Sequence, residues 1–247
     1  MPARLKLIIA YNGAGLRGWQ SQTHRNTVQD QLEGAFRRVT GEQLRVHGAG
    51  RTDAGVHALA QCAHVDLTQR RLSAAQWTSA LNANLSPAIR VLRCSYVRKD
   101  FHARYSAKAK VYRYRIWSAP ILPPLEFERA WHVMAPLDLT KLRAAAAKFV
   151  GTHDFAGFAA RRAKPETNTT RTIYSVRVRK NGFCITIDFE GDGFLYKMVR
   201  LMVGALGQYA FGRLTADELE AQLNSKQPEG RRLVAPAEGL FLLRVRY

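Results

Sequence analysis

The sequence predicts an α+β fold in which each half of the chain contains several strands and at least two helices. Short segments in which apolar and polar residues alternate are typical of strands. Other segments carry an apolar stripe at helical spacing behind a capping signature, which is typical of helices. The chain has 247 residues, of which 47% are hydrophobic, so it is long enough for one large domain or two smaller ones.

The first half is expected to contain two helices, each opened by a capping box. Thr27 is followed by Asp30 and by an apolar stripe that ends near Val39. Ser73 with Gln76 opens the second helix in the same way. The expected strands of this half are residues 5–11, 44–48, 61–67 and 90–97.

The second half repeats this mixture of elements. Its expected strands are residues 108–117, 171–179, 183–189 and 241–247. The turn dipeptide Asn181-Gly182 joins the middle two strands as a hairpin. Helices are expected after Asp138, over residues 194–209 and after Thr215.

The boundary between the halves is expected near residues 99–106. This divides the chain into residues 1–105 and 106–247, which have a similar order of elements without an evident sequence repeat. Residues 161–172 are polar, basic and contain a proline, which predicts a mobile loop.

The charge of the chain indicates the kind of partner. Lys and Arg number 38 against 19 Asp and Glu, which gives a formal net charge of +19. A charge of this sign and size favours a polyanion such as RNA, DNA or an acidic membrane. The alternative is a basic soluble protein without such a partner.

The three cysteines, Cys62, Cys94 and Cys184, lie far apart and form no CxxC motif. Neither a disulfide framework nor a cysteine-rich zinc site is therefore expected. The apolar run near the N-terminus is too short for a signal peptide, and no stretch approaches the ~18 apolar residues of a membrane span. We therefore expect a cytoplasmic protein that is not associated with a membrane.

Two glycine-rich segments are weak matches to nucleotide-binding motifs. Residues 13–18 fit GxGxxG, but the next helix begins only near Thr27, so a flexible glycine turn is the simpler interpretation. Residues 50–55 have the glycine spacing of a P-loop without its lysine, which argues against an NTPase. Asp53 and His57 alone are too few ligands for a metal site, so we expect no metal.

Residues 48–57 hold the densest group of chemically active side chains. Close glycines indicate a close backbone approach or a positive φ, and Arg51 and Asp53 flank a threonine between two expected strands. A carboxylate here would repel phosphate in a basic protein, and catalysis is one reason to keep it. The alternative is a structural loop in which Asp53 caps a helix and Arg51 is a surface charge.

Two further candidates follow from pattern alone. Tyr112 lies where basic and aromatic residues alternate over residues 108–115, which suits stacking on bases and neutralising phosphates. The alternative is an amphipathic strand with a buried tyrosine face. Arg200 lies in an apolar helix, where an acidic partner is expected unless the side chain faces solvent.

Taken together, these segments resemble the tRNA pseudouridine synthase A family along almost the whole chain. Residues 50–58 (GRTDAGVHA) match the family's catalytic loop without departure. The other matching segments, in the family's order, are 11–13 (YNG), 18–22 (GWQSQ), 27–29 (TVQ), 82–87 (NANLSP), 101–107 (FHARYSA), 112–114 (YRY), 154–158 (DFAGF), 194–200 (FLYKMVR) and 235–240 (APAEGL). The main departure is residues 161–172.

The resemblance implies two ferredoxin-like (RRM-like) halves whose sheets share one central antiparallel sheet, the pseudouridine synthase fold. It also implies a homodimer that binds tRNA in a basic cleft. The implied reaction is isomerisation of uridine to pseudouridine at positions 38, 39 and 40 of the anticodon stem-loop. This reaction conserves all atoms and exchanges no electrons, so no cofactor is expected.

The resemblance also implies roles for particular residues. Asp53 is the candidate catalytic carboxylate, and Arg200 is expected to pair with it and keep it ionised. Arg51 is expected to hold the opened RNA backbone, and Tyr112 to stack on the uracil and assist proton transfer. Leu240 is expected to pack against the base. The cations expected to grip tRNA are Arg161, Arg162, Lys164 and Arg171.

Three alternatives to this function remain open on the sequence. One is a non-catalytic RNA-binding module that uses the same basic sheet. Another is an enzyme of the same family that acts on a different RNA or position. A membrane-surface protein is the third, although the chain lacks a basic amphipathic helix with an exposed apolar face.

Overall fold

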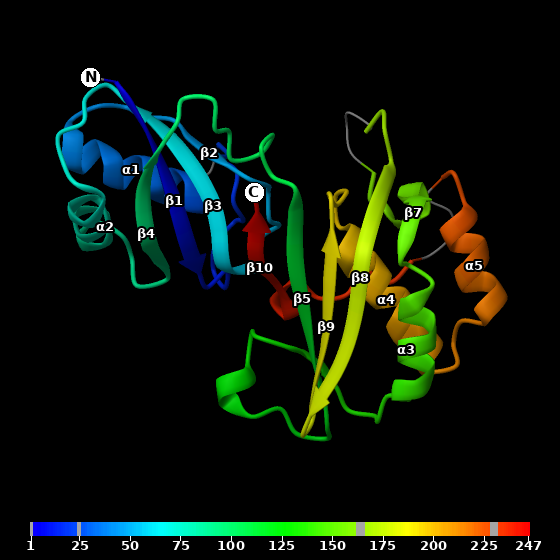
Figure 1. Ribbon diagram of the computed structural model, residues 1–247. Coiled ribbons are helices and arrows are strands. Elements are labelled where there is room, and N and C mark those ends of the chain that lie inside the picture. Colours follow the sequence, from blue (N-terminus) through cyan, green and yellow to red (C-terminus); the bar gives the residue numbers. More distant parts are fainter. Residues whose placement is uncertain (1, 24–25, 162–165, 228–231) are drawn as a thin grey trace. The chain divides into compact units, whose positions relative to one another are not determined.

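A computed structural model of the chain describes residues 2–23, 26–161, 166–227 and 232–247. These residues form two compact units (Figure 1). The first unit comprises Met1–Lys108 with Phe241–Tyr247, and the second comprises Ala109–Leu240. The predicted division fell at residues 105 and 106 and kept the C-terminal strand with the second half. In the structure residues 241–247 belong to the first unit, because they pair with one of its strands.

The first unit has the β-α-β-β-α-β order of a ferredoxin-like fold (Figure 1). Its strands lie in the order β4-β1-β3-β10, and β2 also pairs with β3. β10 runs parallel to β3, and the other pairs are antiparallel. Its elements are β1 (Ala3–Tyr11), α1 (Val28–Thr40), β2 (Val46–Gly48), β3 (His57–Leu67), α2 (Ala74–Ala83), β4 (Ile89–Val97) and β10 (Leu240–Arg246).

The alternation of buried and partly buried residues along β1 shows that one face of this sheet is covered by other elements. Leu5, Leu7 and Ile9 are fully buried, whereas the residues between them are only partly buried. Both predicted capping boxes are present, at the starts of α1 and α2. The two helices meet through Phe36 and Trp77, whose ring centroids lie 5.4 Å apart. One face of the sheet is therefore packed against helices.

The second unit is built on a sheet in the order β5-β9-β8-β7, with β6 parallel to β5. The predicted hairpin is confirmed, since Asn181 and Cys184 are partners on either side of Gly182, which has φ +56°. Its elements are β5 (Ala109–Ser118), β6 (Trp131–Val133), α3 (Leu139–Ala147), β7 (Gly151–Asp154), β8 (Thr170–Asn181), β9 (Cys184–Gly191), α4 (Met198–Ala210) and α5 (Ala216–Asn224), with short 3₁₀ turns at Pro124–Glu126, Phe155–Phe158 and Ala237–Gly239.

Several element boundaries differ from the prediction. The helix predicted over residues 194–209 begins only at Met198, because Lys197 has φ +58°, which a right-handed helix does not accommodate. β3 begins four residues before its prediction, at His57, because its first residues pair with β10 rather than alternate in polarity. The predicted loop over 161–172 ends earlier than expected, since β8 begins at Thr170.

The α+β class is confirmed, and most strand pairs within the two units are antiparallel. The short strands β6 and β7 were not predicted, because three or four residues are too few to show alternation. No helix of the described residues is long and apolar enough to cross a membrane.

Candidate active site

The loop that carries Asp53 joins two neighbouring strands of the first unit. It leaves β2 at Gly48 and enters β3 at His57. Within it the side chain of Thr52 is buried, Asp53 is half-buried and Arg51 is exposed. The segment that the sequence marked as chemically dense therefore forms one short loop at the end of a sheet.

The glycine-rich segment after β1 packs closely against the backbone of this loop. A Cβ atom at Gly13 would lie 2.1 Å from the carbonyl oxygen of Val56, and one at Gly18 would lie 2.5 Å from the carbonyl oxygen of Thr52. The backbone N–H of Trp19 donates to the Thr52 carbonyl over 3.0 Å. The weak GxGxxG match is therefore a turn, as the simpler interpretation held, and its glycines allow close approach of the Asp53 loop.

Two buried polar contacts fix the loop, one at its middle and one where it enters β3. The hydroxyl groups of Tyr11 and Thr52 share a hydrogen bond of 2.8 Å. Burial raises the pKa of Tyr11 to about 12, so this hydroxyl keeps its proton at neutral pH. Where the loop enters β3, the backbone N–H of Gly13 donates to Nδ1 of His57, whose ring stacks on Phe241 at a centroid distance of 4.5 Å. His57 thus positions the loop.

Arg51 projects from the surface of the same loop. Its Nε–H donates to Oε1 of Gln20 over 3.1 Å, and the amide nitrogen of Gln20 donates to Gln29 on α1. This chain of amides orients the arginine, whose side chain is exposed. An exposed and oriented guanidinium suits contact with phosphate.

In the second unit, Arg200 lies in the first turn of α4 and is held by the chain before β10. Its Nε–H donates to the carbonyl of Ala235 over 2.8 Å, and the N–H of Ala235 donates to the carbonyl of Arg200. The hydroxyl of Tyr114 donates to the carbonyl of Pro236, and a Cβ at Gly239 would lie 2.6 Å from the Tyr114 ring. Leu240, which is buried, is the next residue of this segment.

Tyr112 lies on β5 and is only 7% exposed. Its ring meets that of Phe194 edge to face at a centroid distance of 5.0 Å. The contact ties Tyr112 to the turn that precedes α4, the helix whose first turn contains Arg200. Within the second unit, these contacts connect the segments that carry Tyr112, Arg200 and Leu240.

The alternating pattern around Tyr112 is largely structural. Tyr114 is fully buried, and burial raises its pKa well above the usual value. Arg113 forms a bidentate pair with Asp188, and Arg115 pairs with Glu126 over 2.6 Å. The alternative of an amphipathic strand therefore describes Arg113, Tyr114 and Arg115 better than a stacking surface does.

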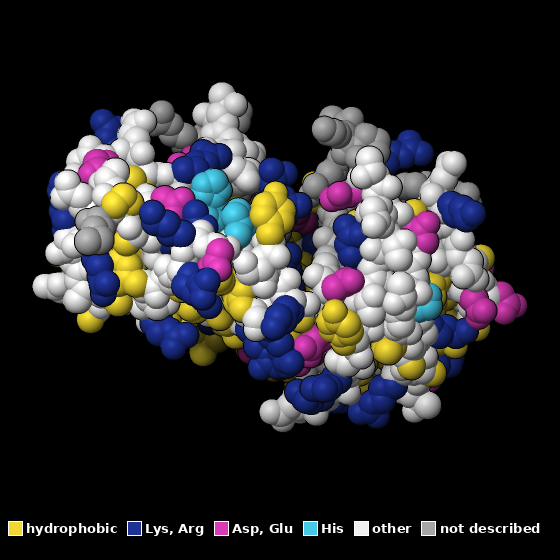
Figure 2. Space-filling view, turned by 45° about the horizontal axis from the view of Figure 1, so that its top comes forward, with side chains coloured by type: hydrophobic (Ala, Val, Ile, Leu, Met, Phe, Trp, Pro, Cys, Tyr) yellow, Lys and Arg dark blue, Asp and Glu magenta, His cyan; other side chains and the backbone are white. Residues whose placement is uncertain are grey.

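The four cations predicted to grip tRNA are only partly described. Arg162 and Lys164 lie outside the described residues. Arg161 is exposed. The guanidinium of Arg171 donates to the backbone carbonyls of Asn168 and Thr170, so it shapes its own segment. Figure 2 shows Lys and Arg side chains spread over the visible face, in keeping with the net charge of +19.

Sequence reasoning did not predict the contacts that hold the site. Tyr11, Gln20 and His57 act through contacts with residues distant in the sequence, which no local pattern reveals. The spacing of Gly13 and Gly18 was the available signal, since glycines mark close backbone approach. Among the residues that the structure describes, no group of three or more His, Cys, Asp or Glu side chains could hold a metal ion.

Comparison with known proteins defines the class. A family model described as tRNA pseudouridine synthase matches residues 8–106 and 145–247. A chain in the crystal structure of a Cbf5-Nop10-Gar1 complex aligns with 82% of this chain and 44% of its own length, with a TM-score of 0.36 and 13% identity. That last similarity is too low to support an argument.

Curated relatives match over nearly their full length. A protein of Akkermansia muciniphila named tRNA pseudouridine synthase A is 45% identical over 99% of this chain and 95% of its own. Proteins with the same name from Rhodospirillum rubrum and Thermoanaerobacter sp. are 42% and 39% identical, over 99% and 98% of this chain and 87% and 98% of their own. The chain belongs to the tRNA pseudouridine synthase family, whose members are isomerases, in agreement with the resemblance seen in the sequence.

Proposed function

We propose that this chain isomerises uridine to pseudouridine in tRNA, at positions 38, 39 and 40 of the anticodon stem-loop. The observation that carries the proposal is the loop GRTDAGVHA, which contains Asp53. Its backbone is held by the close approach of Gly13 and Gly18 and by the hydrogen bond to the Thr52 carbonyl. Relatives named tRNA pseudouridine synthase A cover the chain almost completely. The net charge of +19 supports a nucleic acid as substrate.

The reaction breaks the N1–C1′ glycosidic bond, turns the uracil and forms a C5–C1′ bond. C5 loses a proton and N1 gains one, so the product is an isomer of the substrate. Asp53 supplies the carboxylate beside the sugar, either as a nucleophile that adds covalently or as a base that removes a sugar proton. Both routes require the ionised form of Asp53, and we propose that Arg200 supplies the opposite charge that favours it.

The remaining site residues act on the nucleoside and the RNA backbone. A target uridine within a stem must be flipped out before its sugar can be reached. Arg51, exposed and oriented by Gln20, holds the opened backbone or fills the vacated space. Tyr112 stacks on the uracil and assists proton transfer at C5, and Leu240 packs against the base. Arg161, Arg162, Lys164 and Arg171 contribute to the grip on tRNA.

We further propose that the chain acts as a homodimer in the cytoplasm. Four large apolar side chains of the segment after β5 are strongly exposed: Ile121, Leu125, Phe127 and Met134. Large apolar side chains exposed close together in the sequence are consistent with a surface that a second copy of the chain covers. Sedimentation of the purified chain at micromolar concentration is expected to give twice the mass of one chain, and a monomer would contradict the proposal.

The test of the function uses purified protein, unmodified tRNA and no added cofactor. Pseudouridine is then mapped nucleotide by nucleotide. We expect it at positions 38 to 40 of tRNAs that carry uridine there. Pseudouridine elsewhere would favour an enzyme of the same family with another target, and its absence from every tRNA would favour a non-catalytic RNA-binding module.

A further inference from the structure

One face of the first unit carries aromatic side chains that the proposed reaction does not use. Lys6 on β1 lies opposite His64 on β3, and His64 lies opposite His47 on β2. Leu5 and Leu7 point from β1 into the core beneath the helices, so Lys6, which lies between them, points to the other face. Directly paired residues share a face, so both histidines lie there too.

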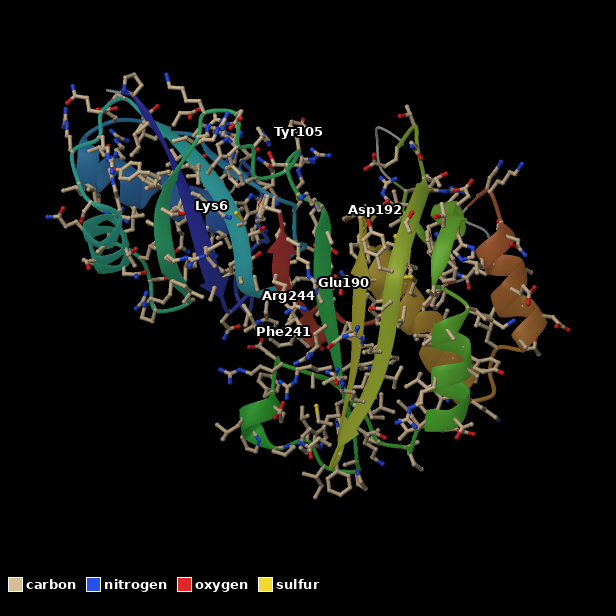
Figure 3. All side chains as sticks on the ribbon, in the orientation of Figure 1. Lys6, Tyr105, Glu190, Asp192, Phe241 and Arg244 are labelled. Atoms are coloured by element: carbon tan, nitrogen blue, oxygen red, sulfur yellow. The ribbon has the colours of Figure 1, made fainter. Side chains whose placement is uncertain are left out.

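Four rings are arranged in succession on this face, and we call them the aromatic column. The rings of His47 and His64 are stacked at a centroid distance of 5.0 Å. His102 contacts His64 at 4.6 Å and Tyr105 at 4.4 Å. Figure 3 shows Tyr105 on the segment that follows β4, and Figure 2 shows histidines side by side on this unit. The column thus leads from the sheet surface to an outer tyrosine.

The turn that carries Tyr105 is held rigidly. Nδ1 of His102 accepts hydrogen bonds from the backbone N–H groups of Arg104 and Tyr105, over 3.1 and 3.2 Å. The hydroxyl of Ser106 accepts a hydrogen bond from the N–H of His102, and Nδ1 of His64 accepts one from Ala103. Tyr105 is nevertheless 77% exposed. A ring fixed in this way loses little conformational freedom when a ligand stacks on it.

The charges around the column suit a polyanion. The Arg104 guanidinium lies 5.7 Å from the centre of the Tyr105 ring, and Lys6 lies over the rings of Phe101 and Tyr247. Asp66, a carboxylate on the same face, is held by a bidentate contact from Arg4. Burial, with further repulsion from Arg4, lowers the pKa of His64 to about 4, so its ring is neutral at pH 7. The column therefore offers aromatic surface bordered by cations.

We propose that Tyr105, backed by His102, is a stacking platform for an unpaired tRNA nucleobase outside the uridine that reacts, with Arg104 contacting an adjacent phosphate. This inference rests on the proposed function, since it takes tRNA as the ligand. An exposed aromatic ring beside an arginine is the arrangement that binds single-stranded nucleic acid. The surrounding cations favour RNA over an apolar protein partner, which would leave them desolvated without a counter-charge.

The test is the affinity of the full chain for unmodified tRNA, measured by fluorescence anisotropy at several salt concentrations. Tyr105→Ala is expected to weaken binding about 5- to 150-fold, the range found when one stacked base loses its aromatic partner. Tyr105→Phe keeps the ring and is expected to bind within about twofold of wild type. Phe183→Ala removes another exposed aromatic side chain, at the β8–β9 turn, and is expected to leave binding unchanged.

The salt dependence separates stacking from charge. Tyr105→Ala is expected to leave the slope of log affinity against log salt unchanged, whereas Arg104→Gln lowers the slope by about one. Wild-type affinity in Tyr105→Ala, or an equal loss in Tyr105→Phe, would overturn the platform. Pseudouridine formation by the wild type is measured alongside. If the wild type is active and Tyr105→Ala binds normally, only the stacking proposal is wrong; if the wild type forms no pseudouridine, the proposed function itself is wrong.

Discussion

The regions around Asp53 and Arg200 hold a charged side chain in different ways. The Asp53 loop is fixed through its backbone, by the close approach of Gly13 and Gly18 and by the hydrogen bond from Trp19. Arg200 is instead fixed through its own guanidinium, which donates to the carbonyl of Ala235. The position of the carboxylate therefore depends on small residues beneath the loop, and that of the arginine on side-chain chemistry.

The largest effect among the substitutions that probe this contrast is expected at Arg200. Arg200→Ala is expected to lower the single-turnover rate about 10²- to 10³-fold while the tRNA dissociation constant changes less than about threefold. Arg200→Lys keeps the charge but loses the Nε–H that contacts Ala235, so it is expected to fall between Ala and wild type. A loss confined to affinity in Arg200→Ala would contradict the proposed pairing with Asp53.

A smaller effect is expected from Gly18→Ala, with Gly15→Ala as its matched control. Both glycines have positive φ, +82° and +73°, so both substitutions strain the backbone by about 1 kcal/mol. Only at Gly18 would the new Cβ meet the Thr52 carbonyl, whereas nothing lies within 4 Å of it at Gly15. We expect a fall in rate of about 10- to 100-fold for Gly18→Ala alone, through displacement of the loop. Equal rates in both variants would break the link between Gly18 and catalysis.

The smallest effect is expected from Tyr11→Phe, which removes the buried hydrogen bond to Thr52. Loss of this bond is expected to cost about 1 to 2 kcal/mol of unfolding free energy, measured by denaturant titration. Tyr174→Phe, at an exposed tyrosine on β8, is the control and should cost less than about 0.5 kcal/mol.

The comparison of wild type with Tyr11→Phe also gives a test of how stability depends on pH. The pKa of Tyr11 is about 12 in the folded chain against 10.0 for its ordinary value. Between these pH values the folded state binds more protons than the unfolded state, so stability falls as the pH rises through this window. We expect a smaller fall in Tyr11→Phe than in wild type. An identical fall in both would contradict the burial of this hydroxyl.

The elements that the sequence predicted well are those with a local signal. The capping boxes at Thr27 and Ser73 and the hairpin at Asn181-Gly182 depend on neighbouring residues, and all three are present. The start of α4 and the length of β3 depend on Lys197 and on pairing with β10, which lie outside any local pattern. The sequence predicted the Asp53 loop as the densest candidate, but not the residues that support it.

Two segments rich in basic and aromatic residues show the same limit of prediction from local sequence. Residues 108–115 alternate in polarity, and their strand buries Tyr114 and pairs Arg113 with Asp188. Residues 101–106 show no alternation, yet their turn exposes Tyr105 beside Arg104. Alternation in a strand assigns one face to the core, whereas exposure of a ring in a turn depends on contacts such as those of His102.

The most direct test of the central claim compares wild type with Asp53→Asn on the same unmodified tRNA, with binding and single-turnover conversion measured together. The amide has the shape of the carboxylate but can act neither as the nucleophile nor as the base. We expect Asp53→Asn to bind tRNA within about threefold of wild type and to form pseudouridine at least about 10³-fold more slowly. Conversion at the wild-type rate by Asp53→Asn would contradict the account.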